Sequence, residues 1–202
     1  MLKREFFDRT TLKVARDLVG SRLVRIEDDG TRLSGIIVET EAYIGPGDLG
    51  CHARAGRTVR NASMWGPPGH AYVYFTYGMH WMLNFVTEPE GFGAAVLIRA
   101  AIPLEGVERM QARRQGHLLS VLADGPAKLC RAFAIDRRFD GHDLCADSSR
   151  LFVEADGLVP GQNVITSPRM GLKNVPDPWK SLPWRFRVEI EGQSPFLVPG
   201  KK

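Results

Sequence analysis

Two short stretches of the sequence carry the residues best suited to chemistry. The first, residues 38–45 (VETEAYIG), places Glu39 and Glu41 two residues apart and beside Tyr43. The second, residues 72–79 (YVYFTYGM), gathers three tyrosines around a glycine. A carboxylate can activate water, and aromatic rings can stack on a flat base. With the arginines between them, the two stretches predict chemistry on a nucleobase flipped out of a duplex.

The two carboxylates lie in a segment that is apolar on both sides. Strand alternation predicts that Ile37, Glu39, Glu41 and Tyr43 share one face and that the intervening residues share the other. A carboxylate in a partly apolar cleft has a raised pKa and can accept a proton from water. The spacing does not distinguish Glu39 from Glu41 as the base, and such a pair is also common on a solvent-facing strand edge.

Tyr77 precedes Gly78 at the expected tip of a β-hairpin formed by residues 71–76 and 79–86. An exposed ring on a hairpin can wedge between base pairs. Stacking of a base on an aromatic ring contributes roughly 1–3 kcal/mol, close to the few kcal/mol needed to unstack one nucleotide. Tyr72 and Tyr74 are equally compatible with the core or rim of a β-rich domain, because tyrosine favours strands.

The charge distribution is compatible with a polyanionic partner. The net charge is +4 and the pI is about 9.1. Between Cys51 and His70 the chain has three arginines and no acid, in a loop that joins the two chemical stretches. The candidates for contacts with a nucleic-acid backbone are Arg54, Arg57, Arg60 and Lys128. A second basic run, Arg109, Arg113 and Arg114, is predicted to be a solvated helix face.

The sequence contains no recognisable metal-ligand set. Cys51, His52, His70 and His80 do not have a compact ligand spacing, so neither a metal nor another cofactor is expected. The three cysteines are far apart and without a CxxC pair, which favours reduced thiols in a cytoplasmic protein. Neither a signal peptide nor a transmembrane stretch is recognisable, so no membrane partner is expected.

Strand signals dominate the chain, and short helices are interspersed among them. The sequence predicts a helix that begins at Thr10 or Thr11, with one of these threonines as its cap, and ends at Gly20. Further helices are expected at residues 105–114 and 127–135, and strands at residues 22–26, 33–43, 71–76, 79–86, 94–101, 151–154 and 184–190. No linker is visible, so residues 1–202 are predicted to form one compact α+β domain.

Six motifs, in this order, give the chain a resemblance to a known family: VETEAY, HARAGR, MWGPPGHAYVY, YGM, LIRAAIPLEG and GPAKLC. Together they resemble the alkyladenine (3-methyladenine) DNA glycosylase family of base-excision repair, from Glu5 to the C-terminal strands. The resemblance implies a DNA glycosylase catalytic domain with a mainly antiparallel curved β-sheet, a protruding β-hairpin and surrounding short helices. It also implies a monofunctional enzyme that flips damaged purines out of double-stranded DNA and leaves an abasic site. The implied lesions are 3-methyladenine and 7-methylguanine, with hypoxanthine and ethenoadenine less secure because no acid for their departure is evident.

The resemblance further implies a role for each site residue. Glu41 matches the residue that activates the attacking water, Arg99 matches one that helps to hold this water, and Glu39 matches a position without a catalytic role. Tyr77 matches the residue that intercalates into the duplex. The residues that match the base-binding pocket are Tyr43, His52, Tyr74 and Asn84. Asn84 would disfavour normal guanine because it would clash with the exocyclic amino group of that base.

One departure and two alternatives accompany this interpretation. His80 stands where the animal enzymes have tyrosine, so the lesion range stays open. The N-terminal extension of the animal enzymes is also missing, which favours a bacterial, nucleoid-associated protein. Because one flipped base needs only one active site, a monomer is expected. One alternative is a non-catalytic module that binds damaged DNA, although a carboxylate such as Glu41 is unfavourable against a phosphate-rich ligand. The other is a bifunctional glycosylase/lyase that uses Lys128 for Schiff-base chemistry.

Overall fold

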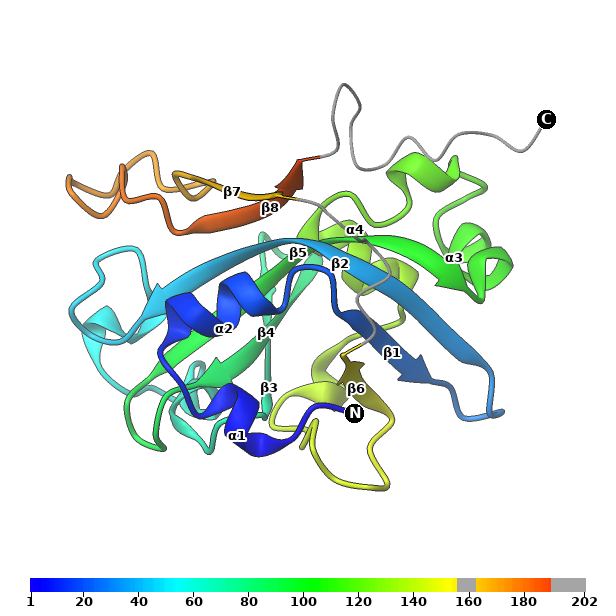
Figure 1. Ribbon diagram of the computed structural model, residues 1–202, viewed down its shortest axis with the longest axis horizontal. Helices are drawn as coiled ribbons and strands as arrows, with labels where there is room; N and C mark the ends of the chain where they lie inside the picture. The colour runs from blue at the N-terminus through cyan, green and yellow to red at the C-terminus, as the bar shows by residue number, and fades with distance from the viewer. Residues whose placement is uncertain (156–162, 190–202) are drawn as a thin grey trace.

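The two longest strands, β2 (Arg32–Ile44) and β5 (Ala94–Glu105), lie antiparallel through the middle of the molecule (Figure 1). The structure is a computed structural model that describes residues 1–155 and 163–189. Both strands are largely buried and rich in valine, isoleucine and alanine. A strand that is apolar on both faces needs cover on both faces, which the surrounding elements provide.

The remaining described strands are β1 (Arg22–Ile26), β3 (Ala71–Thr76), β4 (His80–Thr87), β6 (Leu151–Glu154), β7 (Asn163–Ser167) and β8 (Arg185–Glu189). They extend the central pair into a curled antiparallel sheet in the order β3-β4-β5-β2-β1-β6. On the edge of β2 that lies away from β5, the first residues of β2 pair with β1, and Glu39–Glu41 pair with β8. The predicted α+β domain with a curved antiparallel sheet is confirmed.

Short helices cover the sheet. They are α1 (Arg4–Phe7), α2 (Thr11–Asp17), α3 (Val107–Arg113) and α4 (Pro126–Ala132), with 3-10 turns η1 (His52–Ala55), η2 (Ala62–Trp65), η3 (Leu119–Val121) and η4 (Arg137–Phe139). Helix α2 packs on β2, where Thr40 Oγ1 donates to the Ala15 carbonyl oxygen at 2.7 Å (Figure 1). The main core lies between these layers, and its largest buried side chains include Phe7, Phe85 and Phe133.

The start of α2 differs from the predicted cap. The side chain of Thr10 makes no capping hydrogen bond. Instead, Glu88 Oε1 accepts from the Thr11 backbone N–H at 2.7 Å and from Thr11 Oγ1 at 3.0 Å. A carboxylate 77 residues away satisfies the helix terminus, so local sequence cannot reveal it.

Several predicted boundaries are also corrected. Strand β5 continues to Glu105, so α3 starts only at Val107 rather than at Glu105. Pro103 is tolerated there because β4 pairs with β5 only as far as Leu97, so the later residues of β5 have one unpaired edge. Helix α4 ends at Ala132, and α1 and β7 were not predicted. Of the predicted strand 184–190, Ile190 lies outside the described residues.

Candidate active site

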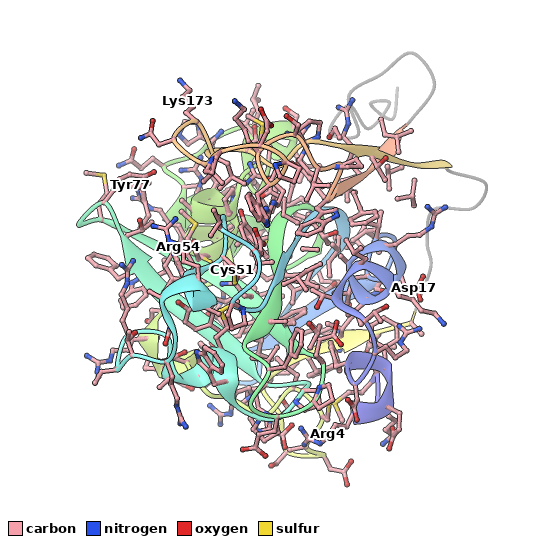
Figure 2. The ribbon with its side chains drawn as sticks, turned by 90° about the vertical axis from the view of Figure 1, so that its left-hand side faces the viewer. Arg4, Asp17, Cys51, Arg54, Tyr77 and Lys173 are labelled. Atoms are coloured by element: carbon pink, nitrogen blue, oxygen red, sulfur yellow. The ribbon has the colours of Figure 1, made fainter. Side chains whose placement is uncertain are left out.

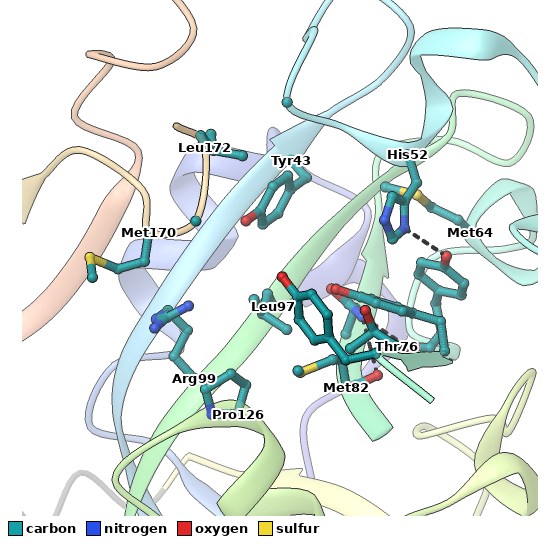
Figure 3. A pocket seen from close by; sticks show the side chains of 16 residues that line it. Tyr43, His52, Met64, Thr76, Met82, Leu97, Arg99, Pro126, Met170 and Leu172 are labelled. Atoms are coloured by element: carbon teal, nitrogen blue, oxygen red, sulfur yellow. Dashed lines mark hydrogen bonds between the residues drawn. The ribbon is translucent and has the colours of Figure 1, made fainter. Parts of the chain in front are cut away.

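A pocket of about 360 Å³ opens where β2, the β3–β4 hairpin, η1 and the segment after β7 converge (Figure 3). This volume falls in the range of small-molecule sites. Six of the predicted site residues line it: Tyr43, His52, Tyr74, Tyr77, Asn84 and Arg99. The structure therefore brings together side chains that span 57 positions of the sequence, from Tyr43 to Arg99.

Two β-bulges decide which side chains of the central strands face the pocket. The β2–β5 register moves from Ile37↔Ala101 to Glu39↔Ala100 and then to Thr40↔Ile98. The first bulge inserts Val38 into β2, and the second inserts Arg99 into β5. Bulges re-aim side chains and are over-represented beside active sites.

The bulge at Val38 corrects the predicted alternation. Ile37 packs in the main core together with Ala42, so it does not share a face with the two glutamates and Tyr43. After the bulge the alternation holds: Thr40 and Ala42 face the core side, whereas Tyr43 lines the pocket. The prediction was right for Glu39, Glu41 and Tyr43 and wrong for Ile37, because an inserted residue reverses the phase of a strand.

Glu41 is fully buried, at 0% exposure, next to the pocket-lining residues Tyr43 and Arg99. Its Oε2 accepts a hydrogen bond from the Tyr43 hydroxyl at 2.8 Å and lies 3.3 Å from Arg99 Nη1. Its Oε1 accepts from the Met170 backbone N–H at 2.7 Å. Because a carboxylate oxygen has two lone pairs, Oε1 retains acceptor capacity for a water molecule.

Glu39 has a different environment from Glu41. Its Oε1 accepts from Arg99 Nε at 2.7 Å and lies 3.6 Å from Arg185 Nε, and the side chain is partly exposed. Arg99 therefore bridges the two carboxylates, with Nε on Glu39 and Nη1 near Glu41. Glu39 is partly exposed and has two cationic neighbours, whereas Glu41 is fully buried and accepts hydrogen bonds from two pocket-lining residues, Tyr43 and Met170, so the geometry distinguishes the two acids where spacing did not.

The environment of Glu41 suits a general base. Burial raises the pKa of the Glu41 carboxyl above its ordinary value, and the Arg99 charge and the hydrogen bonds from Met170 and Tyr43 partly oppose this rise. The same burial, together with the Glu41 charge, raises the pKa of Tyr43 well above its ordinary value. Tyr43 therefore remains a neutral hydrogen-bond donor to Glu41 at physiological pH.

Three further aromatic rings line the pocket besides Tyr43 and Tyr77: Tyr72, Tyr74 and His52, of which His52 is labelled in Figure 3. Tyr72 and Tyr74 stack with ring centroids 5.4 Å apart, and His52 meets Tyr74 edge-on at 4.6 Å. His52 Nδ1 lies 2.9 Å from the Tyr72 hydroxyl. Burial, assisted by the charges of Arg60 and Arg54, lowers the pKa of His52, so its ring is neutral at pH 7.

Asn84 lies on the β4 side of the pocket and is nearly buried. Its Nδ2 donates to the Tyr72 carbonyl oxygen at 3.0 Å and lies 3.5 Å from that of Met82. These two main-chain carbonyls restrain the amide group. A restrained polar group in a pocket can discriminate between ligands that differ by one donor or acceptor.

Tyr77 stands at the hairpin tip, as predicted, with 83% of its surface exposed (Figure 2). Tyr77 and Gly78 both have positive φ, 51° and 66°, as the two central residues of a type I′ turn require. His80 follows on the same hairpin and is also exposed. The strained tyrosine at the tip presents a ring beside the mouth of the pocket.

The arginines predicted to contact a nucleic-acid backbone lie outside the pocket lining. Arg54 Nη1 donates to the Leu49 carbonyl oxygen at 2.8 Å, and Arg60 Nη2 to that of Phe75 at 3.1 Å. Arg57 is exposed. Lys128 Nζ donates to Asp124 Oδ1 at 2.8 Å and lines a second cavity, which places its amine away from the pocket. Contacts with phosphates remain predictions for all four residues.

The second basic run is solvated only in part. Arg109 is exposed, as predicted, and pairs with Asp29 at 2.6 Å and with Glu27 at 3.1 Å. Arg113 and Arg114 are partly buried: Arg113 also pairs with Glu27, and Arg114 Nε donates to the Leu122 carbonyl oxygen at 3.3 Å. These arginines therefore also join α3 to neighbouring segments, which the prediction did not include.

Two site residues from the C-terminal part of the chain were missed by sequence reasoning. Met170 supplies the backbone donor to Glu41, and the side chain of Arg169 is completely enclosed next to it. Their motif, SPRMG, is short and lies in a Pro- and Gly-rich stretch. The one signal that could have found them is an arginine flanked by turn residues after a strand, which is too common to be diagnostic.

Within the described ranges, no group of three His, Cys, Asp or Glu side chains could hold a metal ion. All three cysteines belong to the described part of the chain and are free, as predicted. Burial raises the pKa of the Cys51 thiol to about 12, so it is not a nucleophile at neutral pH. No described helix is long and apolar enough to cross a membrane.

Comparison with known proteins shows which family the chain resembles. Residues 5–191 match the family described as Methylpurine-DNA glycosylase (MPG). A protein of Methanocella arvoryzae with the name "Putative 3-methyladenine DNA glycosylase" is 49% identical over 187 residues, which cover 92% of this chain and 91% of the relative. Proteins with the same name from Chlorobium luteolum and Streptomyces avermitilis are 45% and 46% identical over 201 and 190 residues. These matches cover 99% and 93% of this chain and 97% and 87% of the relatives.

Proposed function

Because the chain belongs to the methylpurine-DNA glycosylase family, whose members are hydrolases of N-glycosyl bonds, we propose that it excises alkylated purines from double-stranded DNA. The observation that carries this proposal is the buried Glu41 carboxylate, which lies directly behind a pocket walled by tyrosine rings. A carboxylate in such a place can act on the sugar of a base that enters the pocket. The proposed lesions are 3-methyladenine and 7-methylguanine.

In the proposed reaction, Tyr77 enters the duplex and the damaged base enters the pocket between Tyr43 and the wall formed by His52 and Tyr74. Glu41 Oε1 takes a proton from the attacking water, and the carboxylate stabilises the oxocarbenium character of the sugar. Arg99 keeps Glu41 ionised and helps to hold the water. Hydrolysis leaves free base and an abasic site.

The pocket suits purines that already carry a positive charge. An N3- or N7-alkylated purine is cationic, stacks well on electron-rich rings and leaves without protonation. The lowered pKa of His52 leaves its ring largely unprotonated at neutral pH, so it has no imidazolium proton to give to a neutral base. We therefore propose that 7-methylguanine is excised faster than hypoxanthine or ethenoadenine. We also propose that the protein acts as a cytoplasmic monomer, since one flipped base needs one pocket.

The proposal is tested by single-turnover excision from duplexes that each contain one 7-methylguanine, hypoxanthine or ethenoadenine. We expect release of free base and a strand that is cut only after alkali treatment. Borohydride should not trap a covalent DNA adduct, whereas trapping would support a lyase reaction by Lys128. Tight binding without release on every lesion would identify a non-catalytic binding module instead.

Replacement of Tyr77 by serine is expected to weaken binding to a lesion duplex by about 5- to 150-fold, the equivalent of the roughly 1–3 kcal/mol of one stacking interaction. Ethenoadenine fluorescence, which reports flipping, should fall in parallel with affinity measured by anisotropy. Tyr77→Phe is the matched control, because it keeps the ring and should bind almost as the wild type does. If Tyr77→Ser flips the base normally, Tyr77 is not the intercalating residue.

A further inference from the structure

The guanidinium of Arg169 lies between two aromatic rings, one of which lines the pocket. Its central carbon is 4.7 Å from the centroid of Tyr43 and 4.9 Å from that of Trp184. Its side chain has 0% exposure and is not part of the pocket lining, so it supports Tyr43 from behind. A guanidinium over an aromatic face is attracted by the ring electrons, which favours this one orientation of Tyr43.

The hydrogen bonds of Arg169 join three separate parts of the chain. Nη1 donates to the Ala42 carbonyl oxygen in β2 at 2.9 Å. Nη2 donates to Asp48 Oδ1 at 2.8 Å and to the Trp179 carbonyl oxygen at 3.2 Å. Asp48 in turn accepts from the backbone N–H groups of Gly50, at 2.9 Å, and Ile44, at 3.2 Å. Arg169 and Asp48 thus tie the end of β2 and its following turn to the segment that precedes β8.

Met170, the residue after Arg169, contacts Glu41, the proposed general base, directly. The Met170 N–H donates to Glu41 Oε1 at 2.7 Å, while the Tyr43 hydroxyl donates to Oε2 at 2.8 Å. Arg169 therefore holds both of these hydrogen-bond donors. Its guanidinium packs on the Tyr43 ring, and its side-chain contacts fix the backbone from which the adjacent Met170 N–H points to Glu41. Arg169 itself touches neither Glu41 nor the pocket.

We propose that Arg169 is a positioning residue for base excision, which together with Asp48 and Trp184 holds the Tyr43 ring and the Met170 N–H in place around Glu41. This inference rests on the proposed function. A buried ion pair is not needed for stability, since well-packed apolar residues often replace one at no cost. Arg169 also leaves its buried Nε without a hydrogen-bond partner among the described residues. Its charge is therefore better explained by the geometry that it imposes.

The positioning role predicts a shift in pH dependence. Burial raises the pKa of the Glu41 carboxyl, whereas the charge of Arg99 and the hydrogen bonds from Met170 and Tyr43 lower it; the charge of Glu39 acts in the same direction as burial. If Arg169 is lost and these bonds lengthen, the pKa of Glu41 rises. Because Glu41 must be ionised to take a proton from water, the excision rate should then fall at a higher pH than in the wild type as the pH is lowered.

The test uses the double variant Asp48→Asn/Arg169→Met, which removes both charges so that neither is left buried and unpaired. Methionine is flexible and apolar and can fill the space between the two rings. On a 7-methylguanine duplex we expect the single-turnover rate at saturating enzyme to fall about 100-fold at pH 7, as for a misplaced catalytic group. The enzyme concentration that gives half of the maximal rate should change little. The acid limb of the pH–rate profile should move to higher pH.

Two further variants keep the inference falsifiable. Leu144→Ala truncates a core residue outside the pocket lining, so it should lower thermal stability without moving the pH profile. Arg169→Lys keeps the charge but loses the forked hydrogen bonds, so we expect it to excise at a rate between those of the wild type and the double variant. If the double variant fails to fold, Arg169→Lys alone tests the positioning role. A folded variant at Arg169 with the wild-type rate and pH profile would overturn the inference and leave the proposed function intact. A wild-type protein that releases no base would instead refute the proposed function.

Discussion

Glu41→Gln is expected to reduce single-turnover excision by about 10²- to 10⁴-fold, the contribution of a general base. Glutamine has nearly the same size, but its amide cannot take a proton from water or stabilise a positive sugar. The pocket rings and Tyr77 are unchanged, so binding to a lesion duplex should be retained. Single-turnover release of 7-methylguanine, measured beside anisotropy with the same duplex, separates the two effects.

Glu39→Gln is the matched control for this experiment. The two glutamates share a strand and one arginine, but Glu39 is partly exposed and has no hydrogen bond to Tyr43 or Met170 among the described contacts, whereas Glu41 is fully buried and has both. Loss of its charge should therefore reduce the rate far less than loss of the Glu41 charge. If Glu39→Gln abolished excision while Glu41→Gln did not, the assignment of the base would be wrong.

Arg99→Met is expected to have the second largest effect. Arg99 is the cation that bridges the two carboxylates, and its charge is the strongest influence that lowers the pKa of Glu41. Without it, burial and the Glu39 charge together raise this pKa further. An arginine beside a carboxyl typically shifts its pKa by about 1–3 units, so the ionised fraction should fall about 10- to 1,000-fold at pH values below the wild-type pKa and by less at higher pH.

The direction of the pH effect follows from the role of Glu41 as a base. Because the ionised form is active, the rate should fall on the acid side, and Arg99→Met should recover as the pH rises. Arg99→Lys, which keeps the charge, should preserve more of the wild-type profile. An equal loss of rate at every pH would mean that Arg99 acts through contact with water or substrate and not through the ionisation of Glu41.

The hairpin and its tip show how much local sequence can determine. The alternating apolar residues of β3 and β4, with Tyr77-Gly78 between them, encode both strands and a turn in which Gly78 readily adopts a positive φ. Such features depend on residues within a few positions of one another. The same holds for β1 and β2, which Gly30 connects in a tight turn.

The pocket could be predicted only in part. The types of residue in the two chemical stretches, and their order, indicated a carboxylate and tyrosine rings for work on a base. They did not reveal that Val38 and Arg99 are inserted as bulges, because a bulge is a property of two paired strands. Strict alternation therefore misplaced Ile37 and had no means of placing Arg99 between two glutamates.

By itself, the sequence determined most of the strands, the hairpin tip and the kinds of side chain available for catalysis, because these depend on short-range periodicity and residue chemistry. Only the tertiary structure decided which carboxylate is buried, since Glu41 acquires its environment from β5 and from Met170, 129 residues away. Arg169 reaches Asp48 across 121 residues in the same way. Contacts at such separations form when the sheet curls and the segment after β7 packs on β2, and no local pattern of residues encodes them.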